Sequence, residues 1–193
     1  MDICVFGASS NRLEQIYFDQ AHALGRAIAC GGHSLVYGGG ASGLMGACAR
    51  GALDVGGRIV GIAPKFFDEP GILLKDYGEF IFTETMAQRK TLMEDKAQAF
   101  IALPGGIGTY EEFFETLTLK QLGRHSKPMA LLNTKGYFEP MVRMLEKTAE
   151  AGFMSRSCIE LFALCSGPEE AVEHCAGGGD EVVRIRHLDE YCR

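Results

Sequence analysis

The stretch at residues 100–115, FIALPGGIGTYEEFFE, constrains the fold more than any other part of the chain. Its first four residues are apolar and predict the end of a buried strand, which Pro104 stops. Gly105, Gly106 and Gly108 predict a turn without side chains, and the residues after them open a helix. Backbone N–H groups at a helix start lack intrahelical partners, and the helix dipole is positive there. The junction is therefore a candidate anion-binding site.

Thr109 and Glu112, at the start of this predicted helix, admit two interpretations. Their T-x-x-E spacing is that of a capping box, in which the glutamate bonds back to the N-cap backbone. Alternatively, Thr109 contacts a bound phosphate, and Glu112 points toward the sugar of the same nucleotide. The local pattern leaves both open.

Two further strand–glycine–helix junctions are predicted earlier in the chain. An apolar run at 2–6 leads into the small-residue loop 7–11, and a run at 33–37 leads into the glycine-rich segment 38–43. Glycine costs chain entropy, so this many glycines indicate close approach of the backbone, either to a ligand or between elements. The G-x-G-x-x-G fingerprint is absent, so a simple NAD-type dehydrogenase is not supported.

The remaining predicted elements alternate. Strands are expected at 58–63, 79–83, 129–133 and 161–165, and helices at 13–30, 44–53, 86–96, 137–151 and 168–175. This alternation predicts an α/β fold, a Rossmann-like doubly wound parallel sheet with helices on both faces. The helix 137–151 is expected to be amphipathic, with Met141, Met144, Leu145 and Ala149 on one face. The irregular segment 64–78 is expected to border the pocket. Ligands in such folds bind at the carboxyl ends of the strands, so all three junctions should face one rim.

Composition agrees with a single domain over residues 1–176, followed by a tail at 177–193. Of the 193 residues, 47% are hydrophobic, which suits one full-sized core. The net charge is −6 without a basic run, which argues against nucleic acid and anionic membranes as partners. No apolar stretch approaches the roughly 20 residues of a membrane span. The seven cysteines are scattered and no signal peptide is evident, so we expect the reducing cytoplasm.

The end of the chain offers a weak metal-binding pattern. His174 and Cys175 precede three glycines, and His187 and Cys192 follow in the charged tail. A strand or a disordered end is favoured for this tail over a metal site. We expect no metal ion and no cofactor.

A basic pair, Arg89 and Lys90, stands in the first turns of the predicted helix 86–96. The helix dipole disfavours cations there. A bound phosphate or an acidic partner explains the pair, and the alternative is a solvated face on which Arg89 pairs with a nearby glutamate. Ser9 and Ser10, in the first junction, either donate to a ligand or cap the next helix.

The shared rim and the pair Arg89 and Lys90 favour the interpretation that the stretch at 100–115 binds a ligand. In it, Thr109 both caps its helix and contacts phosphate, and Glu112 faces the ribose. Glu111 and Glu115 are left to solvent or to a partner subunit.

Three motifs resemble those of the LOG (Lonely Guy) family, namely YGGGASGLMG at 37–46, MAQRK at 86–90 and LPGGIGTYEE at 103–112. The family motif P-G-G-x-G-T-x-x-E is matched in full. Its members are cytokinin-activating nucleoside 5′-monophosphate phosphoribohydrolases, often mislabelled lysine decarboxylases. The resemblance, over residues 2–172, implies hydrolysis of AMP-type nucleotides, including N6-prenylated ones, to free base and ribose 5-phosphate. It also implies a Rossmann-like fold and a homodimer or an assembly of dimers.

The resemblance implies a catalytic pair, Arg89 and Glu112. The expected substrate-binding residues are Ser9, Gly39, Met86, Lys90, Gly105, Gly106, Ile107, Gly108 and Thr109. Ala8 and Ala87 stand where the family commonly has Gly and His, which leaves the reaction in place and the base preference open.

The expected chemistry passes through an oxocarbenium-like ribose. Glu112 either stabilises that cation or activates water, and Arg89 either orients Glu112 or binds phosphate or sugar oxygens. Two alternatives are a non-catalytic carrier of a phosphorylated ligand, such as a molybdenum-cofactor-binding protein, and a nucleotide-sensing regulator. The Arg89/Glu112 pair favours the enzyme, because a carrier does not require it. A decarboxylase is poorly supported, since no lysine stands in a recognisable pyridoxal-phosphate context.

Overall fold

The computed structural model describes residues 1–76 and 78–177. Its strands form one parallel sheet in the order β4-β3-β2-β1-β5-β6-β7. The strands are β1 (Asp2–Phe6), β2 (Ser34–Tyr37), β3 (Ile59–Pro64), β4 (Glu79–Thr83), β5 (Ala99–Ala102), β6 (Met129–Leu132) and β7 (Ala163–Cys165). The order reverses between β1 and β5, which is the topological switch point of a doubly wound sheet. The predicted fold is confirmed.

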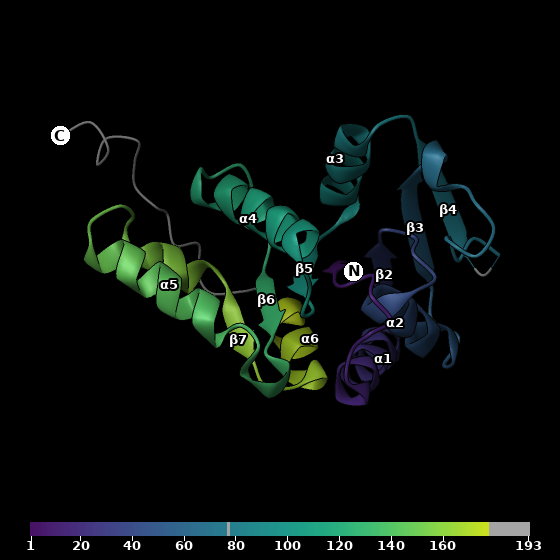
Figure 1. The fold of residues 1–193 in the computed structure, drawn as a ribbon, viewed down its shortest axis with the longest axis horizontal. Coiled ribbons are helices and arrows are strands. Elements are labelled where there is room, and N and C mark those ends of the chain that lie inside the picture. Colours follow the sequence, from purple (N-terminus) through teal and green to yellow (C-terminus); the bar gives the residue numbers. More distant parts are fainter. Residues whose placement is uncertain (77, 178–193) are drawn as a thin grey trace.

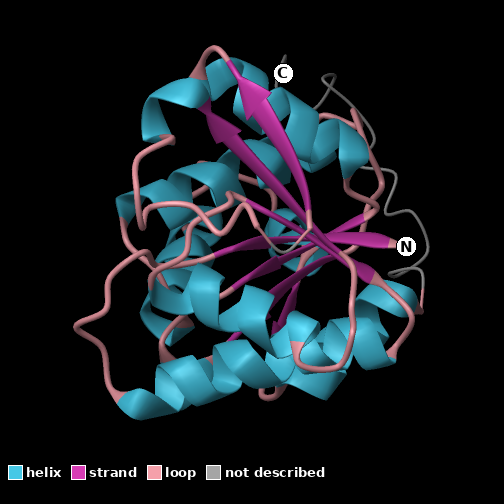
Figure 2. Ribbon diagram, turned by 90° about the vertical axis from the view of Figure 1, so that its right-hand side faces the viewer, coloured by secondary structure: helices cyan, strands magenta, loops and turns pink. Residues whose placement is uncertain are grey.

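Helices cover both faces of this sheet (Figures 1 and 2). The α-helices are α1 (Gln15–Cys30), α2 (Gly43–Leu53), α3 (Met86–Lys96), α4 (Ile107–Gln121), α5 (Glu139–Glu150) and α6 (Pro168–Ala176). Short 3-10 turns are η1 (Lys65–Phe67), η2 (Thr134–Gly136) and η3 (Arg156–Leu161). Helices α1, α2 and α6 share one core with the sheet, and α3, α4 and α5 share the other. None of the described helices combines the length and apolar character that a membrane span requires.

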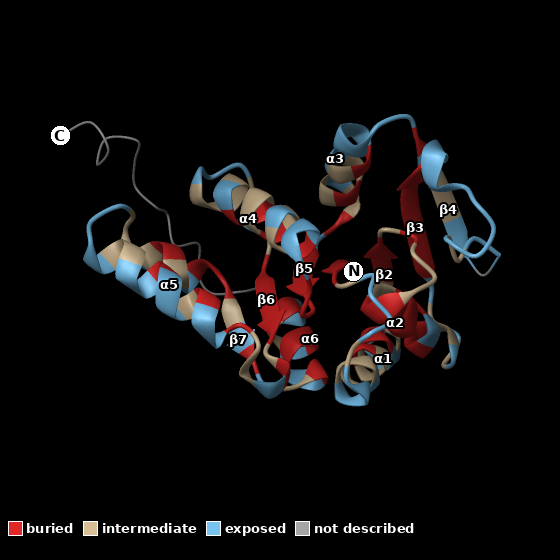
Figure 3. Cartoon of the chain, in the orientation of Figure 1, coloured by how far each residue is buried: buried red, intermediate tan, exposed pale blue. Residues whose placement is uncertain are grey.

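The central strands are buried on both faces, which explains why they read as continuous apolar runs (Figure 3). On β1, Ile3 and Val5 belong to the core under α1, α2 and α6. Cys4 and Phe6 point the other way, into the core under α3, α4 and α5. The strand therefore lies between two apolar cores. Polar side chains that act on a ligand are left to the loops at the strand ends.

Some glycines serve contact between elements. A Cβ at Gly25 in α1 would lie 1.9 Å from the Cys48 carbonyl oxygen, and one at Gly51 in α2 would lie 2.0 Å from the His22 carbonyl oxygen. These two glycines therefore let α1 and α2 pack backbone against backbone. At these two positions the glycines serve close approach between elements and not approach to a ligand.

Several details of the prediction are wrong, and one lies partly outside the described residues. Helix α5 starts at Glu139, not 137, and Met144 is 51% exposed. The buried stripe runs through Phe138, Met141 and Leu145, and Met144 lies beyond its edge. The metal pattern falls partly on the tail after residue 177, which is not described.

Candidate active site

The three predicted junctions meet at one cavity of about 610 Å³ beyond the carboxyl ends of the strands. The lining residues come from five segments of the chain. They are Gly7, Ala8, Ser9, Asn11, Gly38, Gly40, Ser42, Met45, Phe67, Ile72, Leu73, Met86, Arg89, Gly106, Gly108, Thr109, Glu111 and Glu112. The expectation of a shared rim, with segment 64–78 bordering it, is confirmed.

Arg89 of α3 and Glu112 of α4 form a buried ion pair at this cavity. Arg89 Nη1 lies 2.9 Å from Glu112 Oε1, and the two side chains are only 8% and 13% exposed. Arg89 Nε also donates to the Ile62 carbonyl oxygen at 3.2 Å. A Cβ at Gly38 would lie 2.2 Å from Arg89 Nη2, so the glycine makes room for the guanidinium. Arg89 does pair with a glutamate, but in the cavity wall and not on a solvated face.

Burial changes the acidity of Glu112. It raises the pKa of the Glu112 carboxyl above its ordinary value, and the charge and hydrogen bond of Arg89 oppose that rise. The carboxylate is therefore more basic than a solvated one and is held in one orientation. Such a group is suited to accept a proton from a water molecule or to face a developing cation.

Lys90 lies outside the cavity lining. Its Nζ binds Glu111 Oε1 at 2.6 Å and Glu115 Oε2 at 2.8 Å. The hydrogen bonds to these two carboxylates raise the pKa of Lys90. Glu111 and Glu115 are 52% and 39% exposed, so they do face solvent as expected, and both also pair with Lys90. The expected contact between Lys90 and the nucleotide stays a prediction.

The N-cap of α4 lies three residues before Thr109, the predicted N-cap. Gly106 is the N-cap, with extended backbone at φ −86° and ψ −158°, and Thr109 is the third helical residue. The capping box is therefore wrong: Thr109 packs against Gly105, where a Cβ would lie 2.1 Å from its Oγ1. Glu112 bonds to Arg89 instead of to a cap.

Gly106 and Gly108 differ from the packing glycines. A Cβ at either would meet no described atom within 4 Å, and both residues line the cavity. Nothing in the described chain requires them to lack a side chain. The open space lies at the positive end of α4, where the first N–H groups have no intrahelical acceptor. The helix start can therefore receive an anion.

Of the remaining predicted substrate-binding residues, some line the cavity and others do not. Ser9 and Met86 line it, whereas Gly39, Gly105 and Ile107 do not. Ile107 is 87% exposed. A Cβ at Gly39 would lie 2.6 Å from the Phe80 ring, so this glycine serves packing.

The serine cap of α1 is also wrong. Its N-cap is Glu14, and no side-chain hydrogen bond caps the helix. Ser10 Oγ accepts from the Arg12 N–H at 3.1 Å. Ser9 is left as a cavity residue whose role toward a ligand stays a prediction.

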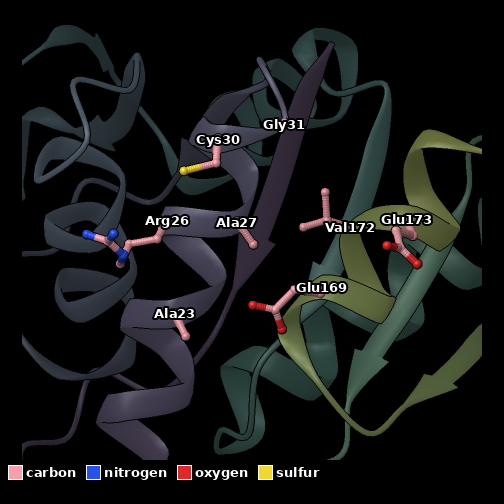
Figure 4. Close-up of a pocket in the computed structure, with 8 residues that line it drawn as sticks. All are labelled: Ala23, Arg26, Ala27, Cys30, Gly31, Glu169, Val172 and Glu173. Carbon is pink, nitrogen blue, oxygen red and sulfur yellow. The ribbon is translucent and has the colours of Figure 1, made fainter.

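A second cavity, of about 390 Å³, lies between α1 and α6 (Figure 4). Its walls combine the apolar Ala23, Ala27 and Val172 with the charged Arg26 and Glu169. It shares no residue with the rim cavity and contains none of the predicted site residues.

Comparison with known proteins agrees with the motifs. The family model described as "Possible lysine decarboxylase" matches residues 45–175. The cytokinin riboside 5′-monophosphate phosphoribohydrolase LOG2 of Arabidopsis thaliana is 42% identical over 153 residues, which cover 79% of this chain and 72% of the relative. The chain belongs to the LOG family. A LOG relative from Rhodococcoides fascians, the cytokinin riboside 5′-monophosphate phosphoribohydrolase, is 43% identical over 157 residues, covering 81% of this chain and 79% of the relative.

Solved structures similar to this LOG protein show its fold alone. The molybdenum cofactor carrier protein of Chlamydomonas reinhardtii aligns with a TM-score of 0.70 at 22% identity, covering 92% of this chain and 96% of the carrier. The shared fold supplies a rim at the strand ends, and the side chains there decide the chemistry.

The sequence does not single out one polar residue of this LOG site, Asn11. Its Oδ1 accepts from the Gly43 N–H at 2.8 Å, which joins the first junction to the second. The only signal for it is an asparagine in the loop after the first strand.

The apolar side of the cavity is also fixed by a contact that spacing cannot reveal. Met45, Phe67, Ile72 and Leu73 form this apolar wall. Gly40 and Leu73 form an antiparallel bridge, and the Ala41 N–H donates to the Ile72 carbonyl oxygen at 2.9 Å. The wall is thus attached to the second glycine junction.

Proposed function

We propose that this LOG protein hydrolyses the N-glycosidic bond of AMP-type nucleoside 5′-monophosphates, including N6-prenylated ones, to free base and ribose 5-phosphate. The observation that carries the proposal is the buried Arg89–Glu112 pair beside the open N-terminus of α4. The names of the relatives, cytokinin riboside 5′-monophosphate phosphoribohydrolases, support the same substrate class.

In the proposed reaction the 5′-phosphate lies at the start of α4, against Gly106 and Gly108. That grip places C1′ of the ribose near Glu112, and remote binding of this kind lowers the barrier by positioning. Water attacks C1′ and gives a proton to Glu112, while the N-glycosidic bond breaks and its electron pair leaves with the base. The base takes up a proton from solvent water, and Glu112 returns its proton to solvent before the next turnover. The raised basicity of Glu112 favours this base role, and Arg89 keeps the carboxylate oriented.

The base is proposed to lie along the apolar wall of Met45, Phe67, Ile72 and Leu73. Each buried CH₂ group contributes about 0.8 kcal/mol, so a prenyl group against this wall strengthens binding. We expect N6-prenyl-AMP to have a kcat/KM at least ~10-fold above that of AMP.

A substrate panel tests the function. The protein is incubated with AMP, N6-prenyl-AMP, CMP, GMP and adenosine, and free base is quantified over time. We expect adenosine to react with a kcat/KM at least ~10²-fold below that of AMP, because it lacks the group that the start of α4 binds. Equal rates for adenosine and AMP would show that no phosphate grip operates.

Replacing Gly108 by Ala separates stability from substrate binding. Gly108 lies in α4 with open space around it, so alanine should raise the free energy of unfolding by about 0.5–1 kcal/mol. The new methyl group faces the proposed phosphate, so KM for AMP should rise. Urea unfolding and steady-state kinetics measure the two effects. Ile107→Ala, one residue earlier and exposed, is the control and should leave KM unchanged; an unchanged KM in Gly108→Ala would contradict the phosphate position.

The pH profile should carry the signature of Glu112. The carboxyl must be ionised to accept a proton, and burial raises its pKa above the ordinary value of 4.5. The kcat/KM for AMP should therefore fall as the pH is lowered, and the midpoint should lie above that of a solvated glutamate. Stopped assays from pH 4 to 8 measure it. A flat acid limb down to pH 4.5 would argue against Glu112 as the base.

A further inference from the structure

The glycine turn before α4 is held by two hydrogen bonds from outside it. The Ala8 N–H, in the loop after β1, donates to the Pro104 carbonyl oxygen at 3.1 Å. The Tyr137 hydroxyl, just before α5, donates to the Gly105 carbonyl oxygen at 2.6 Å. Two consecutive peptide groups of the turn are thus fixed by distant segments of the chain.

Fixing a carbonyl also fixes the amide in the same peptide group. The peptide bond is planar and trans, so the C=O and the following N–H point in opposite directions. With the Gly105 carbonyl directed to Tyr137, the Gly106 N–H is directed away from Tyr137, and Gly106 lines the cavity. The first amides of α4 follow directly and lack intrahelical acceptors. The Tyr137 hydroxyl therefore orients the Gly106 N–H, which is the first in this series of amides without intrahelical acceptors.

Tyr137 is itself held on several sides. Its ring meets Tyr17 of α1 edge to face, with centroids 6.3 Å apart, and meets Phe138 in the same way at 5.1 Å. The Tyr110 side chain of α4 lies close by, and burial together with the neighbouring Tyr137 hydroxyl raises the pKa of Tyr110. The Gly105 carbonyl can only accept, so the Tyr137 hydroxyl is the donor of the bond between them.

We propose that Tyr137 is a positioning residue for phosphate binding, which acts by fixing the Gly105–Gly106 peptide so that its amide faces the bound anion. The inference rests on the proposed function in one respect, since it takes the anion to be the 5′-phosphate of the substrate. Tyr137 does not line the cavity. It acts through the backbone, so its loss affects phosphate affinity and leaves bond cleavage by Arg89 and Glu112 in place.

The test is Tyr137→Phe in the full chain, which keeps the ring contacts and removes the hydroxyl. The probe is ribose 5-phosphate, because it carries the phosphate and contains no bond to cleave. Calorimetry should show its Kd raised about 3- to 10-fold, the effect of one ordinary hydrogen bond. The KM for AMP should rise by the same factor with kcat within about 2-fold. The affinity for adenine, which lacks phosphate, should not change.

Two further variants serve as matched comparisons. Tyr17→Phe removes a hydroxyl from the other ring of the edge-to-face pair, and the Kd for ribose 5-phosphate should stay at the wild-type value. Tyr110→Phe removes the neighbouring hydroxyl of α4 and leaves the bond from Tyr137 to Gly105 in place, so the Kd for ribose 5-phosphate should stay within about 2-fold of the wild-type value. Thermal unfolding of each variant shows whether the fold is kept.

The possible outcomes separate this inference from the function. An unchanged Kd in Tyr137→Phe overturns it, and so does equal weakening of ribose 5-phosphate and adenine, which would indicate general loosening. If the wild-type protein leaves AMP intact yet Tyr137→Phe selectively weakens ribose 5-phosphate, the proposed function fails and the positioning role stands. A wild-type protein that binds no ribose 5-phosphate overturns both.

Discussion

Replacing Glu112 by Gln is expected to lower kcat for AMP-type nucleotides by at least ~10²-fold while the chain stays folded. The amide has nearly the shape of the carboxylate, and its oxygen still accepts from Arg89, which lies 2.9 Å away. It neither takes up the proton of the attacking water nor carries the negative charge that faces a cationic ribose. Steady-state hydrolysis of AMP, with circular dichroism to check folding, measures the effect.

The control for this variant is Glu115→Gln. Glu115 lies on the same helix and pairs with Lys90, but it does not line the rim cavity. Its amide variant should keep kcat within about 3-fold of the wild type, since an ion pair at this exposure contributes little. Near wild-type turnover in Glu112→Gln, or an equal loss in both variants, would remove Glu112 from the reaction.

Replacing Arg89 by Ala should damage both activity and stability. The side chain of Glu112 is 13% exposed, and without Arg89 it is a buried carboxylate with no cation. Removing one partner of a buried ion pair costs about 3 kcal/mol or more. Turnover should fall at least ~10²-fold, because the carboxylate loses its orientation and its pKa rises further. Urea unfolding and AMP hydrolysis measure the two losses.

The double variant Arg89→Ala/Glu112→Gln separates the two effects. The neutral amide no longer leaves a buried charge, so the double variant should be more stable than Arg89→Ala alone. It should remain as inactive as either single variant. Stability losses that simply add would show that the two residues are not coupled in the folded protein.

The fold could be predicted from the sequence because small residues or a proline mark the ends of strands. The run at 2–6 and the run at 33–37 end in small residues, and Pro104 marks the end of a third strand. Strands buried on both faces give continuous apolar runs, and helices give a 3.6-residue period. Since parallel strands end at one edge, the gathering of loops 7–11 and 38–43 at one cavity followed from the fold class.

The detailed site could not be read in the same way, because it depends on how α3 and α4 meet. Thr109 and Glu112 have the spacing of a capping box, and only the nearby Arg89 shows that Glu112 serves another purpose. Lys90 follows Arg89 directly, yet it pairs with Glu111 and Glu115 and does not line the cavity. No local sequence pattern shows that the side chains of Arg89 and Lys90 point to different partners.

The most direct test of the central claim is a product balance with N6-prenyl-AMP in large excess over the protein. Free N6-prenyladenine and ribose 5-phosphate are both quantified as the nucleotide disappears. The proposed function predicts equal amounts of the two products, growing far beyond the amount of protein. With Glu112→Gln, at most about one hundredth of these products should form over the same time. Nucleotide that binds tightly and is recovered intact from the wild-type protein would contradict it and would indicate a carrier or a sensor.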